Sequence, residues 1–128
     1  MSPFLSDDWF DRLREEAAEL PEVTGASAEV VVVVSDAPTG QVRVHLVVED
    51  GRLVSIDPTT DGDDPLELGC PYELAEAIVR GDTSVSVEFM RGALKVNGDI
   101  GALHRILPLT DDQRFVGLLR TLAAQTEF

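Results

Sequence analysis

The sequence predicts one domain of the α+β class that spans residues 1–128. Its length is that of one ordinary domain, and 44% hydrophobic residues are enough to fill one core. Three strand patterns in the first half follow one another with only turns between them, which predicts an antiparallel meander. A local meander favours the α+β class over a parallel sheet wound by alternating helices.

The chain begins with a predicted helix over about residues 6–20. Ser6 can cap its N-terminus, and the aspartates after it lie at the positive end of the helix dipole. Pro21 ends the pattern. The apolar residues that recur at helical spacing are Trp9, Phe10, Leu13, Ala17 and Leu20.

The β-branched run over residues 29–34 predicts a buried strand, and Pro38 and Gly40 predict a turn after it. Residues 42–48 alternate between apolar and polar side chains, apart from Val47. Alternation of this kind is typical of a half-buried strand, because successive side chains point to opposite faces of a sheet.

Asp50-Gly51 predicts a two-residue hairpin turn, and a third strand follows over residues 53–56. Residues 57–64 form an acidic, turn-rich stretch whose four aspartates raise the question of calcium. An EF-hand loop closes with a glutamate at its twelfth position, whereas counting from Asp57 or from Asp61 reaches Leu68 or Tyr72. We therefore expect a solvated loop.

Residues 66–68 predict a short fourth strand, and an amphipathic helix follows over residues 71–80. A shorter helical segment, capped by Asp82 or Ser84, is expected to reach Met90.

The last third of the chain predicts a fifth strand over Ala93–Val96 and two further helices. Asp99 can cap the first of these helices, and Pro108 is expected to end it. Residues 110–113 form a capping-box pattern for the second. The two apolar stripes consist of Ile100, Leu103, Ile106 and Leu107, and of Phe115, Leu118, Leu119 and Leu122.

The net charge is −14, from 24 acidic and 10 basic residues. Such a charge argues against nucleic-acid binding, which needs a basic surface, and allows at most transient contact with anionic membranes. Residues 1–79 hold 18 acids and 4 bases, whereas residues 80–128 hold 6 of each. An apolar ligand or a membrane contact is therefore expected in the neutral C-terminal part.

The chain has one cysteine, Cys70, so an internal disulfide is impossible and an oxidising compartment is not indicated. The first ten residues lack the basic and apolar regions of a signal peptide, and the last residues are not a peroxisomal signal. The longest apolar run, Val30 to Val34, is far too short to span a bilayer. A cytoplasmic location is expected.

Residues that could carry chemistry are few. Two histidines and one cysteine nearly exclude a structural zinc site, and no nucleophile elbow, P-loop or dinucleotide-binding glycine motif is present. His45 lies among the polar positions of a strand, and Cys70 fits a small buried hydrophobe. His104 fits a helix surface or a cap, although it could orient a polar ligand head. We expect no enzyme activity, no cofactor and no metal.

The C-terminal part holds an excess of apolar side chains. Both an ordinary core and a lipid pocket use such residues, so composition leaves the two alternatives open. The residues are Phe89, Met90, Leu94, Val96, Ile100, Leu103, Ile106, Leu107, Leu109, Phe115, Leu118 and Leu119.

The stretch Phe89-Met-Arg-Gly-Ala-Leu-Lys-Val-Asn-Gly-Asp-Ile-Gly-Ala-Leu103 resembles the signature of the sterol carrier protein 2 family. The resemblance covers residues 72–107, and the order of elements over residues 6–97 agrees with it. It implies a five-stranded, mostly antiparallel sheet with helices over one face and an apolar tunnel. The tunnel wall would include Phe89, Met90, Leu94, Val96, Ile100, Leu103 and Leu107, and the lid would include Phe115, Leu118 and Leu119.

The function that the resemblance implies is passive carriage of a fatty acyl chain, an isoprenoid or a sterol-like lipid. An anionic head could meet Arg91, Lys95, His104 or Arg105 at the entrance. One alternative is an accessory or scaffold protein of the same fold that binds an enzyme or a second copy of itself. Another is a small hydrolase or isomerase that uses His104 with a nearby carboxylate.

Overall fold

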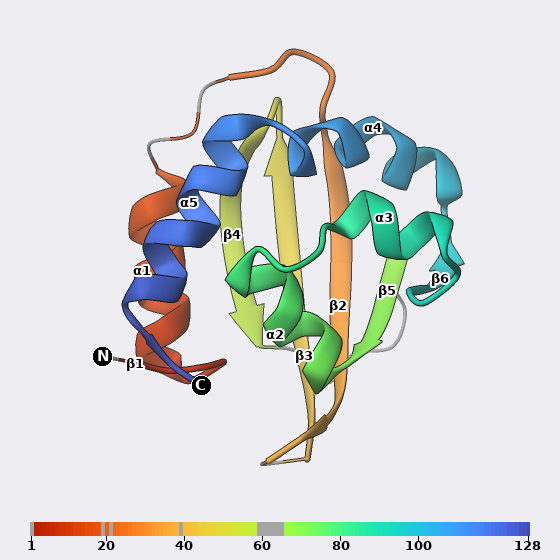
Figure 1. Cartoon of the computed structure of the whole chain (residues 1–128). Helices are drawn as coiled ribbons and strands as arrows, with labels where there is room; N and C mark the ends of the chain where they lie inside the picture. The colour runs from red at the N-terminus through yellow and green to blue at the C-terminus, as the bar shows by residue number, and fades with distance from the viewer. Residues whose placement is uncertain (1, 19, 21, 39, 59–65) are drawn as a thin grey trace.

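The computed structural model describes residues 2–18, 20, 22–38, 40–58 and 66–128 (Figure 1). Most of the predicted acidic loop, residues 59–65, lies outside this part, as does Pro21. The helices are α1 (Asp7–Ala17), α2 (Tyr72–Arg80), α3 (Val85–Met90), α4 (Ile100–Thr110) and α5 (Gln113–Ala124). The strands are β1 (Ser2–Pro3), β2 (Ala28–Ala37), β3 (Gly40–Glu49), β4 (Arg52–Pro58), β5 (Leu66–Pro71), β6 (Lys95–Gly98) and β7 (Thr126–Glu127).

The main sheet has five strands in the order β4-β3-β2-β5-β6. All neighbours are antiparallel except β2 and β5, which confirms the α+β class and the mostly antiparallel sheet. The meander of β2, β3 and β4 is also confirmed. Its second turn places Asp50 at φ 48° and Gly51 at φ 83°, the left-handed values that a two-residue hairpin turn of type I′ requires.

The central strand β2 carries valines on both faces. Val30, Val32 and Val34 point to the face that the helices cover, since they border the apolar space beneath the helices. Val31 points to the opposite face and is nevertheless 0% exposed. Its neighbours across the sheet are His45 and Glu67, whose long side chains flank it. This explains why the run of valines does not alternate with polar residues.

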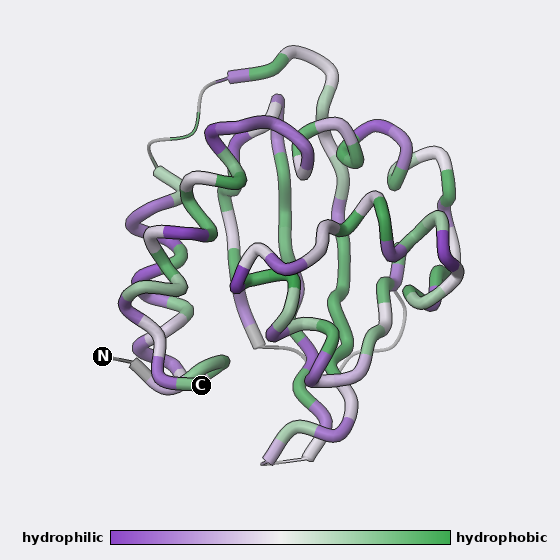
Figure 2. The backbone as a smooth tube through the Cα atoms, viewed as in Figure 1, coloured by the Kyte–Doolittle hydropathy of each residue, from purple (hydrophilic) through white to green (hydrophobic). Residues whose placement is uncertain are grey.

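The helices form a layer over one face of the sheet (Figure 1). Ser6, Ser84 and Asp99 cap α1, α3 and α4, each accepting a hydrogen bond from a backbone N–H in the first turn. Figure 2 shows hydrophobic residues along the middle strands of the sheet and alternating hydrophilic and hydrophobic turns along α5. Helix α5 therefore turns an apolar stripe toward the interior.

Several predicted boundaries are wrong. Helix α1 ends at Ala17 and not at residue 20. Helix α4 continues past Pro108 to Thr110. Proline keeps a helical φ, and in the last turn it removes only the one hydrogen bond that its own N–H would have donated. The cap of α5 is Asp112, so residues 110–113 do not form the predicted capping box. The fifth strand covers Lys95–Gly98 instead of 93–96, because Gly98 pairs with the first residue of β5.

The two ends of the chain are joined, which the sequence did not indicate. Strands β1 and β7 pair in parallel, and Phe4 packs against Phe128 with ring centroids 5.2 Å apart. Beneath them, the indole N–H of Trp9 donates to the buried hydroxyl of Thr126 at 2.9 Å. That hydroxyl donates in turn to the carbonyl oxygen of Leu122 at 2.5 Å. The contact fastens α1 to the end of α5.

Replacing Thr126 with valine is expected to destabilise the protein by about 1–3 kcal/mol, because the buried N–H of Trp9 loses its acceptor. The carbonyl of Leu122 also loses a donor and keeps only the backbone N–H of Gln125. Urea unfolding followed by the fluorescence of Trp9 measures the loss. Thr126→Ser keeps the hydroxyl and serves as the control. Equal stability of the valine and serine variants would contradict the prediction.

Candidate functional site

Buried apolar side chains gather in two clusters within the hydrophobic core. One cluster joins the chain ends to the meander and is made of Phe4, Trp9, Phe10, Val44, Ile56, Val79 and Leu122. The other lies beneath α4 and is made of Val30, Leu66, Ala102 and Leu103. A single filled core would join them, so the division raises the question of what lies between.

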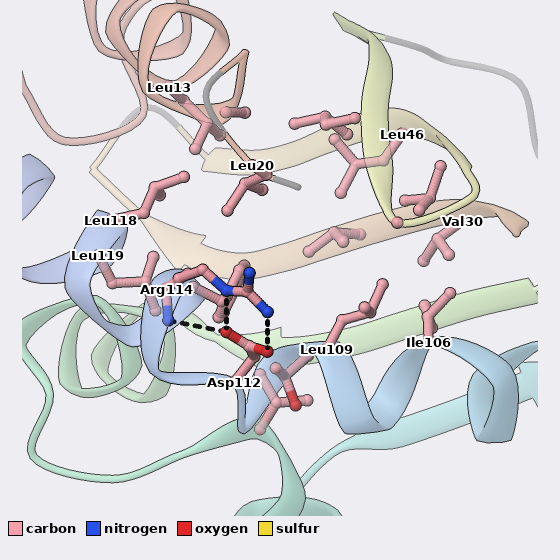
Figure 3. A pocket seen from close by; sticks show the side chains of 18 of the residues that line it. Leu13, Leu20, Val30, Leu46, Ile106, Leu109, Asp112, Arg114, Leu118 and Leu119 are labelled. Atoms are coloured by element: carbon pink, nitrogen blue, oxygen red, sulfur yellow. Dashed lines mark hydrogen bonds and ion pairs between the residues drawn. The ribbon is translucent and has the colours of Figure 1, made fainter. Parts of the chain in front are cut away.

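Apolar space borders both clusters. The larger compartment measures 280 Å³ and lies between the sheet and helices α1, α4 and α5 (Figure 3). The smaller compartment measures 200 Å³ and extends toward α2. The two compartments share six lining residues, Trp9, Leu13, Val32, Leu46, Leu68 and Val85, and together we call them the apolar cavity.

Three strands provide the floor of the apolar cavity. Val32 of β2, Leu46 of β3 and Leu68 of β5 are only half-buried, although helices cover this face of the sheet. Their side chains border the unfilled space of both compartments. The helices provide the roof, with Leu13 from α1 and Leu118 from α5 facing the floor (Figure 3).

Charged groups border the larger compartment at one place, where α4 turns into α5. Asp112 caps α5 by accepting from the backbone N–H of Arg114 at 2.8 Å. The guanidinium of Arg114 also donates from Nε to Oδ1 at 3.1 Å and from Nη2 to Oδ2 at 3.2 Å (Figure 3). These hydrogen bonds lower the pKa of Asp112 and raise that of Arg114, so both groups stay charged.

The structure brings four of the ten expected lining residues to the apolar cavity. Phe115, Leu118 and Leu119 of α5 border the larger compartment. Leu94, in the loop before β6, borders the smaller one.

The other six expected residues lie away from it. Leu103 is a member of the cluster beneath α4, and Phe89, Val96 and Leu107 pack against that cluster. Met90 is 84% exposed and Ile100 is 47% exposed. In this structure the apolar side chains of the motif stretch therefore serve mainly the core.

About half of the lining comes from the N-terminal half of the chain, where no lining residue was expected. Trp9 and Leu13 belong to the apolar stripe of the first helix, and Val32, Leu46 and Val48 to the inward side of the first two strands. The periodicity identified these faces as apolar. It carried no signal that distinguished cavity wall from filled core.

The basic residues expected near a ligand head also lie elsewhere. Arg91 contacts Glu88 at 3.3 Å, and Arg105 donates to the backbone oxygen of Ser27 at 3.2 Å. His104 and Lys95 are exposed, and none of the four borders the apolar cavity. Arg114 does border it, and the sequence reasoning missed it because an arginine inside an amphipathic helix carries no special signal.

Within the part of the chain that the structure describes, no three His, Cys, Asp or Glu side chains gather as metal ligands would. Among the helices described, none is long and apolar enough to cross a membrane.

No protein-family model matches the sequence, and no curated protein matches it. The fold does match solved structures. A structure of sterol carrier protein 2 aligns with a TM-score of 0.67 at 17% identity, covering 91% of this chain and 97% of its own. A conserved hypothetical protein from Thermus thermophilus, described there as a candidate sterol carrier protein, aligns at 0.66 with 16% identity over 96% and 92%. Palmitated sterol carrier protein 2-like 2 from Aedes aegypti aligns at 0.63 with 11% identity over 88% and 96%.

The fold also resembles part of a much longer enzyme. The inverting sec-alkylsulfatase Pisa1 from Pseudomonas sp. aligns with a TM-score of 0.50 and 15% identity, over 77% of this chain but only 14% of its own. Taken together, the comparisons show that the chain has the sterol carrier protein 2 fold, which confirms the fold implied by the stretch from Phe89 to Leu103.

The thiol of Cys70 borders the smaller compartment, and burial raises its pKa. The reactive thiolate is therefore scarcer at neutral pH in the folded than in the unfolded protein. We expect a thiol-specific reagent to label native Cys70 several-fold more slowly than the same protein in urea. Since the chain has no other cysteine, the labelling rate reports this site alone. Equal rates in the two conditions would contradict the assignment.

Proposed function

We propose that the chain is a lipid-binding protein that takes a fatty acyl, isoprenoid or sterol-like group into the apolar cavity and does not act as an enzyme. The observation that carries the proposal is the apolar cavity itself. It divides the core in two, and apolar side chains form nearly all of its wall. A polar substrate would lose its hydration there and gain few hydrogen bonds in return.

Burial of an alkyl chain supplies enough free energy for useful affinity. Each methylene removed from water contributes about 0.8 kcal/mol, so about fourteen methylenes contribute about 11 kcal/mol. Association costs at least about 4 kcal/mol, which leaves at most about 7 kcal/mol and a dissociation constant no lower than about ten micromolar. Such binding depends on length and shape, so its selectivity among lipids is expected to be weak.

The similar structures support the proposal through the lipids that their names mention. One is a sterol carrier protein 2, and another carries palmitate. They share the fold with this chain at only 11–17% identity. The argument that this chain takes a similar ligand therefore rests on its apolar cavity and not on the sequence identity. A passive carrier in the cytoplasm, with only transient membrane contact, is the form of the function that we favour.

The second candidate is an accessory module that binds an enzyme or a second copy of itself. It is favoured by the alignment with part of a sec-alkylsulfatase, where the same fold belongs to a larger protein. In this case the apolar cavity would stay empty or collapse. Ligand content therefore separates the two candidates.

Native mass spectrometry of the purified protein, followed by solvent extraction and lipid analysis, is the first test. We expect a stoichiometric lipid, or uptake of one added long-chain lipid per protein. A mass without lipid, together with no uptake of fatty acid, isoprenoid or sterol, would exclude the carrier and favour the accessory module.

Filling the apolar cavity should abolish most of the binding. Val32→Phe places a ring into both compartments, which removes room for two to three methylenes, or about 2 kcal/mol. The expected result is about thirtyfold weaker binding of a long-chain lipid, measured by fluorescence titration. Because the ring enters space that is already unfilled, the folded structure should persist.

The matched control is Val54→Phe on strand β4. Val54 is 54% exposed and lies outside the apolar cavity. This variant should bind like the original protein. Equal binding by both phenylalanine variants would mean that the lipid is held elsewhere.

A further inference from the structure

One pair of charged residues lies at the wall of an otherwise uncharged cavity. Among the described residues that line the two compartments, Asp112 and Arg114 alone carry a charge, and both border the larger compartment. The sheet side of that compartment is formed by aliphatic side chains such as Val30 and Leu46. The corner between α4 and α5 is therefore the place in this compartment where charged side chains can meet the polar head of an amphiphile.

Although Arg114 is paired with Asp112, its guanidinium keeps donors for a further partner. A guanidinium has five N–H donors. Asp112 receives one from Nε and one from Nη2. The two donors of Nη1 and the second donor of Nη2 remain, and the side chain is 62% exposed. Asp112, itself anchored as the cap of α5, holds the guanidinium at the cavity wall (Figure 3).

We propose that Arg114 is the specificity-determining residue of the apolar cavity, binding the anionic head of a single-chain amphiphile such as a long-chain carboxylic acid, and that Asp112 positions it. This inference rests on the proposed lipid-binding function and names the ligand class. An arginine fork matches the two oxygens of a carboxylate better than it matches a lone hydroxyl.

The charge of the whole chain limits how many negative charges the head can carry. At a net charge of −14 the protein repels anions, and every further charge on a head adds to this repulsion. Asp112 also cancels much of the local charge of Arg114. A head with one negative charge can still gain charge-assisted hydrogen bonds from Arg114, whereas a head with several charges is disfavoured.

The test uses Trp9 as the reporter, because it borders both compartments and is the only tryptophan. Dibromostearic acid and its methyl ester quench tryptophan on contact and differ only in the head, which is a carboxylate in the first and an uncharged methyl ester in the second. Each is titrated at a pH well above the pKa of the acid, into the original protein, Arg114→Gln and Arg120→Gln. The last variant loses the same charge from an exposed position of α5 outside the apolar cavity.

We expect Arg114→Gln to weaken acid binding about fivefold, the effect of one partly exposed charged contact, and to leave ester binding unchanged. Arg120→Gln should leave the ratio of acid to ester affinity unaltered. The advantage of the acid over the ester in the original protein should also shrink as salt is added.

The outcomes separate the two proposals. If the original protein binds acid and ester and Arg114→Gln does not change their affinity ratio, the role of Arg114 is wrong while lipid binding stands. The same holds if Arg120→Gln changes the ratio equally. If neither lipid quenches Trp9 in the original protein, both the proposed function and this inference are overturned.

Discussion

The parallel pairing of β5 with β2 is the constraint on which the remaining structure depends. It joins Val31–Ser35 to Glu67–Pro71 and makes β2 the middle strand of five. Parallel strands cannot be joined by a two-residue hairpin, which is why β5 does not simply continue the meander of β2, β3 and β4. Helix α2 follows β5 at once, and α3, α4 and α5 then cover the same face. The apolar cavity lies between this layer and the inward valines.

The helices cover the sheet without filling the space beneath them. They pack tightly at two places, where the joined chain ends hold α1 to α5 and where α4 lies on Val30 and Leu66. Side chains between the two clusters border open space and lose dispersion contacts there. An empty cavity therefore lowers stability, and an apolar ligand that fills it restores those contacts. Under the proposed function, ligand binding and stability are therefore linked.

The candidate site was predictable only in part. The apolar stripe of α5 could be read from the spacing of Phe115, Leu118 and Leu119, and these residues do border the apolar cavity. Met90 and Ile100 are equally apolar in the sequence but lie on the surface. Whether an apolar side chain meets core, cavity or solvent depends on which helix lies over it, and that is a long-range property. The same holds for the polar residue Arg114. It borders the apolar cavity because α5 begins at that place, and the sequence pattern does not indicate where that is.

The sequence by itself determined the local structure. Alternation, β-branching, caps and the Asp50-Gly51 turn act between residues close in the chain, so they predicted the class, the meander and most helices. Tertiary structure alone decided two things: that the chain ends pair and that the core divides around a cavity. Each depends on contacts between distant segments, whose packing the pattern of apolar residues does not encode.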